Sequence, residues 1–237
     1  MQNTKMQIYH KLSETHEATL QSPKKLEPLS LLQKYEQMVD GTLGEWKSEL
    51  VTFDLKNGAQ PYNGRSFLVP KIHKATLHKE VDQMVELCFL KRESESEWAF
   101  LPFIIPKSNQ TVQFISDFCN LNKVLKRKAL PLPKIVETLQ ELEGFTYASQ
   151  LDLNMGYYTI RLDPDSSKIC TIVLPWGKYS YQRLPMGVAG LPGIFQEKMM
   201  GLMSDLRYVR AYIDDLLIIL KDLFRDHLTK LEKVFFA

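Results

Sequence analysis

The chain has 237 residues, of which 44% are apolar, so it is long enough to bury a core as one large or two small subdomains. A formal net charge of +2 is too small to indicate nucleic-acid binding by itself. The odd number and wide spacing of Cys88, Cys119 and Cys170 argue against a disulfide framework or a cysteine metal cluster. No apolar run approaches the roughly 20 residues of a membrane span, and the polar N-terminus is unlike a signal peptide. The composition therefore predicts an intracellular protein, cytoplasmic or nuclear, with no membrane partner.

Hydrophobic periodicity and turn residues predict the order of the elements. Residues 1–30 are polar without a sustained period, which predicts a weakly ordered linker. A short helix is predicted over 31–39 and an amphipathic helix over 75–90, followed by strands at 100–106 and 112–115. The remaining predicted elements are a helix at 135–142, a strand at 146–153, a hairpin of 169–174 and 179–183, a helix at 195–206, strands at 208–213 and 216–220, and a helix at 225–236. This mixture of strands and helices predicts an α+β fold.

Two adjacent carboxylates, Asp214 and Asp215, interrupt the apolar run AYIDDLLIIL at 211–220. An unpaired buried carboxylate is unfavourable by several kcal/mol, and neighbouring like charges repel each other, so the pair needs a partner. The predicted strands place Asp214 and Asp215 at a two-residue hairpin connection, although Asp-Asp is not a usual turn pair. A solvated acidic turn would also explain an isolated Asp-Asp. A divalent metal ion is the partner that would explain the pair together with its apolar surroundings.

A third carboxylate, Asp152, lies near the end of the predicted strand at 146–153. The intervening chain is long enough for a helix-containing crossover that brings this strand beside the hairpin. Carboxylates on adjacent strand ends form a hard oxygen site of the kind that Mg²⁺ uses with water and substrate phosphate. Two such ions would serve phosphoryl transfer by activating the attacking oxygen and stabilising the leaving oxygen.

These carboxylates belong to a series of motifs that follow one another from about residue 31 to the end. The motifs are Gly64-Arg65 with Pro70, SEWA at 96–99, IPK at 105–107, FISDF at 114–118 with LNK at 121–123, PLPK at 131–134, LDLNMGYY at 151–158, YQRLPMG at 181–187 with Phe195-Gln196, and YIDDLLII at 212–219. In this order, the series resembles reverse transcriptases of gypsy-class long-terminal-repeat retrotransposons.

The resemblance implies a right-hand polymerase with fingers at about 31–145 and a partial palm at about 146–237. The palm sheet would carry helices packed on one face, and the chain would be truncated before the thumb. The thumb and the ribonuclease H domain of the polyprotein are expected to be missing. The implied partners are an RNA or DNA template with its primer, and deoxynucleoside triphosphates.

The resemblance also assigns the catalytic carboxylates. It implies that Asp152 and Asp214 hold two Mg²⁺ or Mn²⁺ ions, that the Leu153 carbonyl assists one of them, and that Asp215 completes the set. The implied reaction is nucleotidyl transfer to a primer 3′-hydroxyl.

Nucleotide contacts follow from the same resemblance. Lys107 would neutralise charge on the triphosphate, although an ordinary solvated turn lysine is an equal reading of the sequence alone. Tyr157 would lie beneath the sugar and exclude a 2′-hydroxyl, whereas without the resemblance it would be assigned to the core. Met186 and Gly187 would pack against the incoming base, and Gln113 occupies a triphosphate-contacting position.

The basic segment Lys123–Lys128 is the clearest candidate for contact with a nucleic-acid backbone. Within it Lys126, Arg127 and Lys128 are assigned to nucleic-acid binding, together with Arg183 before the Leu-Pro-Met-Gly turn. A charge run is also often only a solvated face, so the alternative stays open.

The sequence departs from the family at four positions, where Gln110, Gln113, Cys119 and Gly190 replace a usual glycine, arginine, arginine and asparagine. Glutamine retains hydrogen bonding at position 113 but loses the permanent planar cation. These changes and the expected truncation predict that the isolated chain is inactive. The alternative to a polymerase-domain fragment is a non-catalytic remnant with weak nucleic-acid binding only. Another two-metal enzyme, such as a nucleotide cyclase or nuclease, would share the carboxylates but not the ordered fingers motifs.

Overall fold

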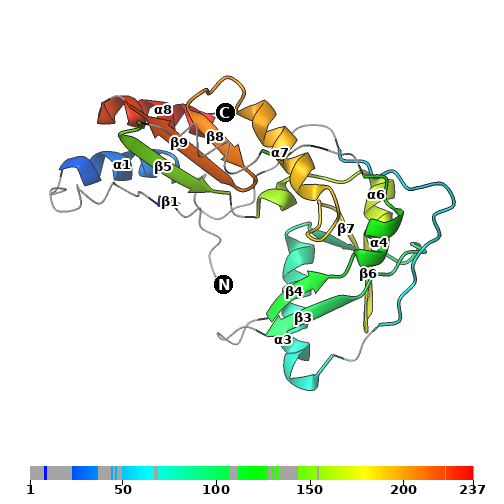
Figure 1. The fold of residues 1–237 in the computed structure, drawn as a ribbon. Coiled ribbons are helices and arrows are strands. Elements are labelled where there is room, and N and C mark those ends of the chain that lie inside the picture. The colour runs from blue at the N-terminus through cyan, green and yellow to red at the C-terminus, as the bar shows by residue number, and fades with distance from the viewer. Residues whose placement is uncertain are drawn as a thin grey trace. The chain divides into compact units, whose positions relative to one another are not determined.

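The structure is a computed structural model that describes residues 8–9, 23–36, 44, 46, 50–66, 69–106, 112–127, 130, 132–133, 144–153, 155–221 and 223–236. The chain divides into two compact units, each assembled from separated stretches (Figure 1). Unit 1 comprises residues 1–44, 130–156 and 192–237, and unit 2 comprises residues 45–129 and 157–191. None of the described helices is long and apolar enough to cross a membrane. The division into fingers and palm at about residue 145 stays a prediction.

Unit 1 is built on a four-stranded antiparallel sheet. Its strands are β1 (Ile8–Tyr9), β5 (Tyr147–Asp152), β9 (Asp215–Leu220) and β8 (Val209–Tyr212), in that spatial order. Its helices are α1 (Pro23–Lys34), α7 (Leu191–Leu202) and α8 (Phe224–Phe236). The β8–β9 hairpin lies beside β5, as predicted from the length of the chain between Asp152 and Asp214.

The two faces of this sheet differ because successive strand residues point to opposite sides. Ser149 and Leu151 of β5 are buried, as are their partners Ile218 and Leu216 of β9. Gln150 and Asp215 are exposed on the other face, and Asp152 is partly exposed there. We call this second side the open face. The register thus places Asp152 opposite Asp215 on the open face.

Helix α8 covers the buried face of the sheet. The buried His227 of α8 forms a hydrogen bond of 2.7 Å with the Ser149 hydroxyl, and the Tyr147 ring packs against Phe224. Helix α1 in turn contacts α8. Tyr35, which directly follows α1, packs on Phe235, and its hydroxyl donates to the Glu232 carboxylate at 2.9 Å. Apolar burial, at roughly 1.5–3 kcal/mol for each fully buried large side chain, holds these layers together.

Unit 2 contains two small sheets and three helices among its described residues. The three-stranded sheet has the order β2 (Leu90–Arg92), β7 (Gly177–Tyr181) and β6 (Thr171–Leu174), and β3 (Pro102–Pro106) pairs with β4 (Val112–Ser116). The helices are α3 (Lys71–Glu86), α4 (Cys119–Val124) and α6 (Pro164–Ile169), and a 3₁₀ helix, η2 (Gly156–Thr159), begins at the unit boundary.

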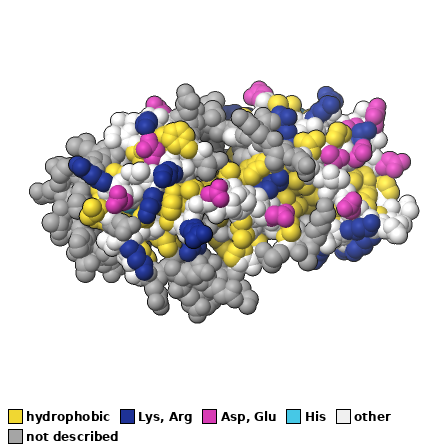
Figure 2. Space-filling model, turned by 90° about the horizontal axis from the view of Figure 1, so that it is seen from above, with side chains coloured by type: hydrophobic (Ala, Val, Ile, Leu, Met, Phe, Trp, Pro, Cys, Tyr) yellow, Lys and Arg dark blue, Asp and Glu magenta, His cyan; other side chains and the backbone are white. Residues whose placement is uncertain are grey.

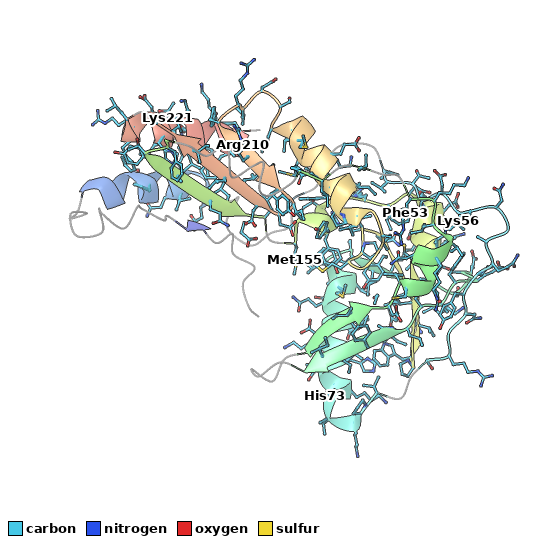
Figure 3. All side chains as sticks on the ribbon, viewed as in Figure 1. Phe53, Lys56, His73, Met155, Arg210 and Lys221 are labelled. Carbon is cyan, nitrogen blue, oxygen red and sulfur yellow. The ribbon has the colours of Figure 1, made fainter. Side chains whose placement is uncertain are left out.

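The core of unit 2 forms around the fully buried Phe100. Its ring contacts Tyr62, Trp98 and Phe118 at centroid distances of 5.3–5.7 Å. The residues that precede α3 are tied to the same unit by polar contacts. The Phe53 N–H donates to the Ser166 hydroxyl at 2.7 Å, and Figure 3 labels Phe53 and Lys56 in this region.

Several predicted boundaries are wrong at helix starts. Helix α3 begins at Lys71 rather than 75 and ends at Glu86, because the chain turns at Cys88 with a φ of 57°. Helix α7 begins at Leu191 rather than 195, with Pro192 in its first turn, where a missing N–H costs nothing. Helix α1 covers residues 23–34 instead of 31–39, and so includes residues assigned to the linker. The helix predicted at 135–142 lies outside the described residues.

Candidate active site

The β8–β9 hairpin turns one residue earlier than the sequence predicts. Tyr212 and Asp215 are paired across the ladder, so the two connecting residues are Ile213 and Asp214, and Asp215 is already the first residue of β9. Ile213 has a φ of 53°, in the left-handed region that a β-branched residue rarely adopts. The predicted connection of Asp214 and Asp215 is therefore wrong by one position. The sequence does not show this turn, because a β-branched residue such as Ile213 rarely adopts a left-handed conformation.

The side-chain amide of Gln196 holds this turn. Gln196 lies in α7, is 1% exposed, and donates from Nε2 to the Ala211 carbonyl oxygen at 2.8 Å. Its Oε1 accepts from the Ile213 N–H at 2.7 Å. One amide thus satisfies an acceptor and a donor that flank the turn, which compensates for the left-handed backbone at Ile213.

The backbone of Asp214 is tied to the end of β5. Its carbonyl oxygen accepts a hydrogen bond from the Leu153 N–H at 2.8 Å. The Leu153 carbonyl oxygen in turn accepts from the Gly156 N–H at 3.1 Å. Asp214 therefore lies next to the segment that carries Asp152. Figure 3 labels Met155, which lies at this end of the sheet, whereas Lys221 follows the opposite end of β9.

The Asp214 carboxylate is half-buried beside a glycine. Its Oδ1 is buried and has no hydrogen-bond partner within the described part of the chain. A Cβ added at Gly156 would lie 3.0 Å from this oxygen and 2.7 Å from Cζ of Phe195. The close approach of the carboxylate, the aromatic ring and the 156 backbone thus requires glycine. A buried, unpaired carboxylate oxygen is what a cation or a proton would satisfy.

Electrostatics couple the three carboxylates. Burial, followed by the charges of Asp152 and Asp215, raises the pKa of Asp214 to about 6. Burial, with the charge of Asp215, also raises the pKa of Asp152. On the open face, Gln150 Nε2 donates to Oδ1 of Asp215 at 2.9 Å. The charge of Asp215 therefore disfavours ionisation of Asp152 and Asp214 unless a positive charge compensates it.

The donor set fits a divalent ion only in part. Among the residues that the structure describes, no three His, Cys, Asp or Glu side chains are arranged to hold a metal ion together. Mg²⁺, however, is usually held by one or two carboxylates and completes its shell with water and substrate phosphate. The unpaired Oδ1 of Asp214 and the charge coupling to Asp152 match such an incomplete set.

In unit 2, a second amide holds the turn that includes Met186 and Gly187. Nδ2 of Asn122 donates to the Gly187 carbonyl oxygen at 2.8 Å, and Oδ1 accepts from the Ala189 N–H at 2.7 Å. Gly187 has a φ of 93°, and a Cβ there would lie 3.3 Å from the Ser116 carbonyl oxygen. Met186 is 49% exposed, so its side chain is open to solvent at the apex of a fixed turn.

The other nucleotide candidates are described less fully. Tyr157 is partly exposed in η2. Gln113 lies in β4 opposite Ile105, and its side chain is outside the described set. Lys107 lies outside the described residues, so its contact with a triphosphate stays a prediction.

The candidates for nucleic-acid contact differ in exposure. Lys126 and Arg127 are exposed, and Lys128 lies outside the described residues. Arg183 is only 8% exposed, and its Nη1 donates to the Tyr158 carbonyl oxygen at 3.0 Å. Because its guanidinium is buried and hydrogen-bonded within unit 2, the structure does not favour the predicted nucleic-acid contact. On the face that Figure 2 shows, basic and acidic side chains are interspersed.

The sequence identifies the carboxylates of the site but not the residues that hold them in place. Gln196 and Gly156 stand in the quoted motifs, yet nothing in their local sequence shows that they contact Asp214 or the residue before it. Asn122 was likewise part of a motif without a role. Their functions depend on contacts between segments distant in sequence, which only the folded structure shows.

Comparison with known proteins places these observations in a family. Residues 105–236 match the family model for reverse transcriptase (RNA-dependent DNA polymerase). The chain is 28% identical over 156 residues to the transposon Tf2-3 polyprotein of Schizosaccharomyces pombe, covering 65% of this chain and 12% of that protein. It is 25% identical over 182 residues to the retrovirus-related Pol polyprotein from transposon 297 of Drosophila melanogaster, covering 74% of this chain and 17% of that protein.

The fold is similar to two foamy viral protease-reverse transcriptase structures. One is in complex with double-stranded DNA and has a TM-score of 0.79 at 21% identity, and the other is in complex with an RNA/DNA hybrid and has a TM-score of 0.82 at 20% identity. Each covers 92% of this chain, which spans 38% and 29% of the respective viral chains. The predicted α+β fold of polymerase fingers and palm is confirmed.

Proposed function

The chain belongs to the reverse transcriptase family, and from that premise we propose that it is the fingers and part of the palm of a gypsy-class retrotransposon polymerase. The motif series from Gly64 to Ile219 supports the gypsy-class assignment. Because the chain spans only 12–17% of its polyprotein relatives, the activity of such whole proteins is part of the proposal.

The proposed reaction is templated nucleotidyl transfer. The primer 3′-oxygen forms a bond to the α-phosphorus of a deoxynucleoside triphosphate, the bond between the α-phosphorus and the bridging oxygen breaks, and pyrophosphate leaves with the electron pair. Divalent ions, when bound, would promote transfer of the primer hydroxyl proton to solvent water and offset the charge that develops on the phosphate oxygens. Asp152 and Asp214 would hold these ions, with Asp215 and the Leu153 carbonyl as supporting oxygens.

The remaining residues would shape the substrate position. Tyr157 would bound the sugar and exclude a 2′-hydroxyl, while the fixed turn with Met186 and Gly187 would lie against the incoming base. Lys107 and Gln113 would contact the triphosphate, and Lys126, Arg127 and Lys128 would contact the nucleic-acid backbone. RNA or DNA with a primer is the proposed partner.

The single observation that carries this proposal is the buried, unpaired Oδ1 of Asp214 at a hairpin whose charge is coupled to Asp152. Such an oxygen needs a cation or a proton, and at neutral pH a pKa of about 6 leaves it mostly ionised. A divalent ion held by Asp152 and Asp214 would offset both the desolvation penalty and the repulsion between the carboxylates.

Mn²⁺ binding tests the proposal directly. We expect weak Mn²⁺ binding by the wild type, measured by water-proton relaxation. The affinity of Asp214→Asn should be lower by at least about tenfold. Asp205→Asn, which removes an exposed carboxylate from the same unit, is the matched control and should bind as the wild type does. Equal affinity in wild type and Asp214→Asn would remove Asp214 from the site.

A non-catalytic remnant is the second candidate, and a specific observation favours it. Gln113 and Cys119 stand where the resemblance expects arginines, and Cys119 is exposed in α4. Loss of two cations at a triphosphate site would weaken substrate binding while leaving the fold intact. Such a remnant would keep weak nucleic-acid binding through residues such as Lys126 and Arg127.

A further inference from the structure

The turn that carries Asp214 has an unfavourable backbone. A β-branched residue, Ile213, adopts a φ of 53° at its first connecting position, where glycine or asparagine would be ordinary. Such a conformation persists only where surrounding contacts favour it over an extended alternative.

Gln196 supplies such a contact from a different element. Its amide joins the Ala211 carbonyl oxygen and the Ile213 N–H, at 2.8 and 2.7 Å, from the buried side of α7. The adjacent Phe195 ring lies against Gly156, at the position where a Cβ would approach both the ring and Oδ1 of Asp214. Consecutive residues of α7 therefore define the backbone of the turn and the space for its carboxylate.

We propose that Gln196 is a positioning residue of the carboxylate site, because its amide selects the left-handed turn that places Asp214 beside the end of β5. Without this amide, the Ile213 N–H and the Ala211 carbonyl lose their partners, and Ile213 relaxes toward a more ordinary φ. Rotation of the backbone there moves Asp214 away from the Leu153 N–H and from Gly156. The hydrogen bonds of the Gln196 amide go to backbone atoms of the turn and not to the Asp214 carboxylate.

The consequence for metal binding rests on the proposed function. Groups that orient a ligand without touching the ion affect affinity through the ligand's position, typically by 10- to 100-fold. Gln196 would then influence metal affinity although the structure places its amide on backbone atoms only. The role of the amide can be separated from general stability, because glycine at position 213 adopts the same φ without strain.

The first experiment measures the turn itself in metal-free protein. Amide hydrogen exchange by NMR is compared between wild type, Gln196→Met and the control Glu197→Met, which alters the exposed neighbour on the same helix. In Gln196→Met we expect exchange at Ile213 to increase about tenfold or more, while Ile219, whose N–H donates to the Tyr208 carbonyl, stays protected. Unchanged protection of Ile213 in Gln196→Met would overturn the proposal, whether or not the protein binds metal.

The second experiment measures Mn²⁺ affinity and rescue. Gln196→Met should bind Mn²⁺ about tenfold more weakly than wild type, and Glu197→Met should bind within about twofold of it. The double variant Gln196→Met with Ile213→Gly should recover most of the affinity, since glycine restores the left-handed turn without the amide. A purely structural role would show no such rescue, so a double variant as weak as Gln196→Met would contradict the inference. If the wild type binds no Mn²⁺, the proposed metal site fails while the exchange measurement still decides the role of Gln196.

Discussion

At the scale of single residues, Gly156 is the position where the site leaves least space. A methyl group there would lie 2.7 Å from the Phe195 ring and 3.0 Å from Asp214 Oδ1, and both neighbours belong to buried or half-buried groups. We expect Gly156→Ala to lower the free energy of unfolding by about 1–3 kcal/mol, the usual range for overpacking. Urea denaturation monitored by circular dichroism measures this change.

The same substitution at Gly201 provides the control. Gly201 lies in α7 with no atom within 4 Å of an added Cβ, so Gly201→Ala should stabilise by up to about 1 kcal/mol through helix propensity. If both variants were equally stable, the packing described around Gly156 would be incorrect.

The Asp214 carboxyl predicts a pH dependence of stability in metal-free buffer. Its folded pKa of about 6 lies above the unfolded value near 4, so the folded state retains a proton that the unfolded chain has lost. Stability from this group is therefore greatest below about pH 4 and declines as the pH rises to about 6, and Asp152 acts in the same direction. Because Asp214 is half-exposed, the decline should be no more than about 1 kcal/mol after screening.

Comparison with Asp214→Asn isolates this contribution, because carboxylates whose pKa is lowered in the folded state change stability in the opposite direction. Glu232 is one of them, since its hydrogen bond from Lys34 lowers its pKa. Thermal unfolding of both proteins from pH 4 to pH 7 should show that the variant gains stability relative to the wild type as the pH rises. A difference between them that is constant with pH would contradict the raised pKa.

At the scale of elements, two turns are held by side-chain amides from neighbouring helices. Asn122 of α4 holds the 187–189 backbone in unit 2 much as Gln196 of α7 holds 211–213 in unit 1. Asn122→Ala removes both hydrogen bonds and should destabilise the protein by about 1–2 kcal/mol. It should also increase amide exchange at Ala189.

Asn120 offers a comparison on the same helix. Its side chain accepts from Lys123 on the exposed surface, so Asn120→Ala should change stability by less than about 0.5 kcal/mol. Normal protection of the Ala189 amide in Asn122→Ala would show that the turn is held by other contacts.

The elements also show what the sequence could and could not predict. Strands β3, β4, β5 and β9 were predicted within about two residues, because apolar runs bounded by polar turns identify them. The hairpin connection was placed one residue too late, because the turn at Ile213 depends on Gln196 from another segment. The carboxylates of the site were identifiable because buried like charges are chemically conspicuous, whereas Gln196, Asn122 and Gly156 act only through tertiary contacts.

At the scale of the whole molecule, the proposed polymerisation depends on positive charge at the triphosphate position. Replacing an arginine that contacts a triphosphate by a neutral side chain weakens binding by about 1.5–3 kcal/mol, or about 10- to 150-fold. Gln113 and Cys119 stand at two positions where the resemblance to the family implies an arginine. Cys119 is exposed, and its interaction with Asp117 raises the pKa of its thiol.

A chimera that joins this chain to the downstream part of a related reverse transcriptase would test this dependence. Deoxynucleotide incorporation on a primed RNA template should be undetectable with Gln113 and Cys119 in place. It should become measurable and Mg²⁺-dependent when Gln113→Arg and Cys119→Arg are introduced together, because two cations then compensate the triphosphate charge. The same repaired chimera with Asp214→Asn is the blank. Efficient extension by the unrepaired chimera would refute the remnant interpretation, while inactivity of a repaired and correctly folded chimera would show that substrate binding fails at positions other than 113 and 119.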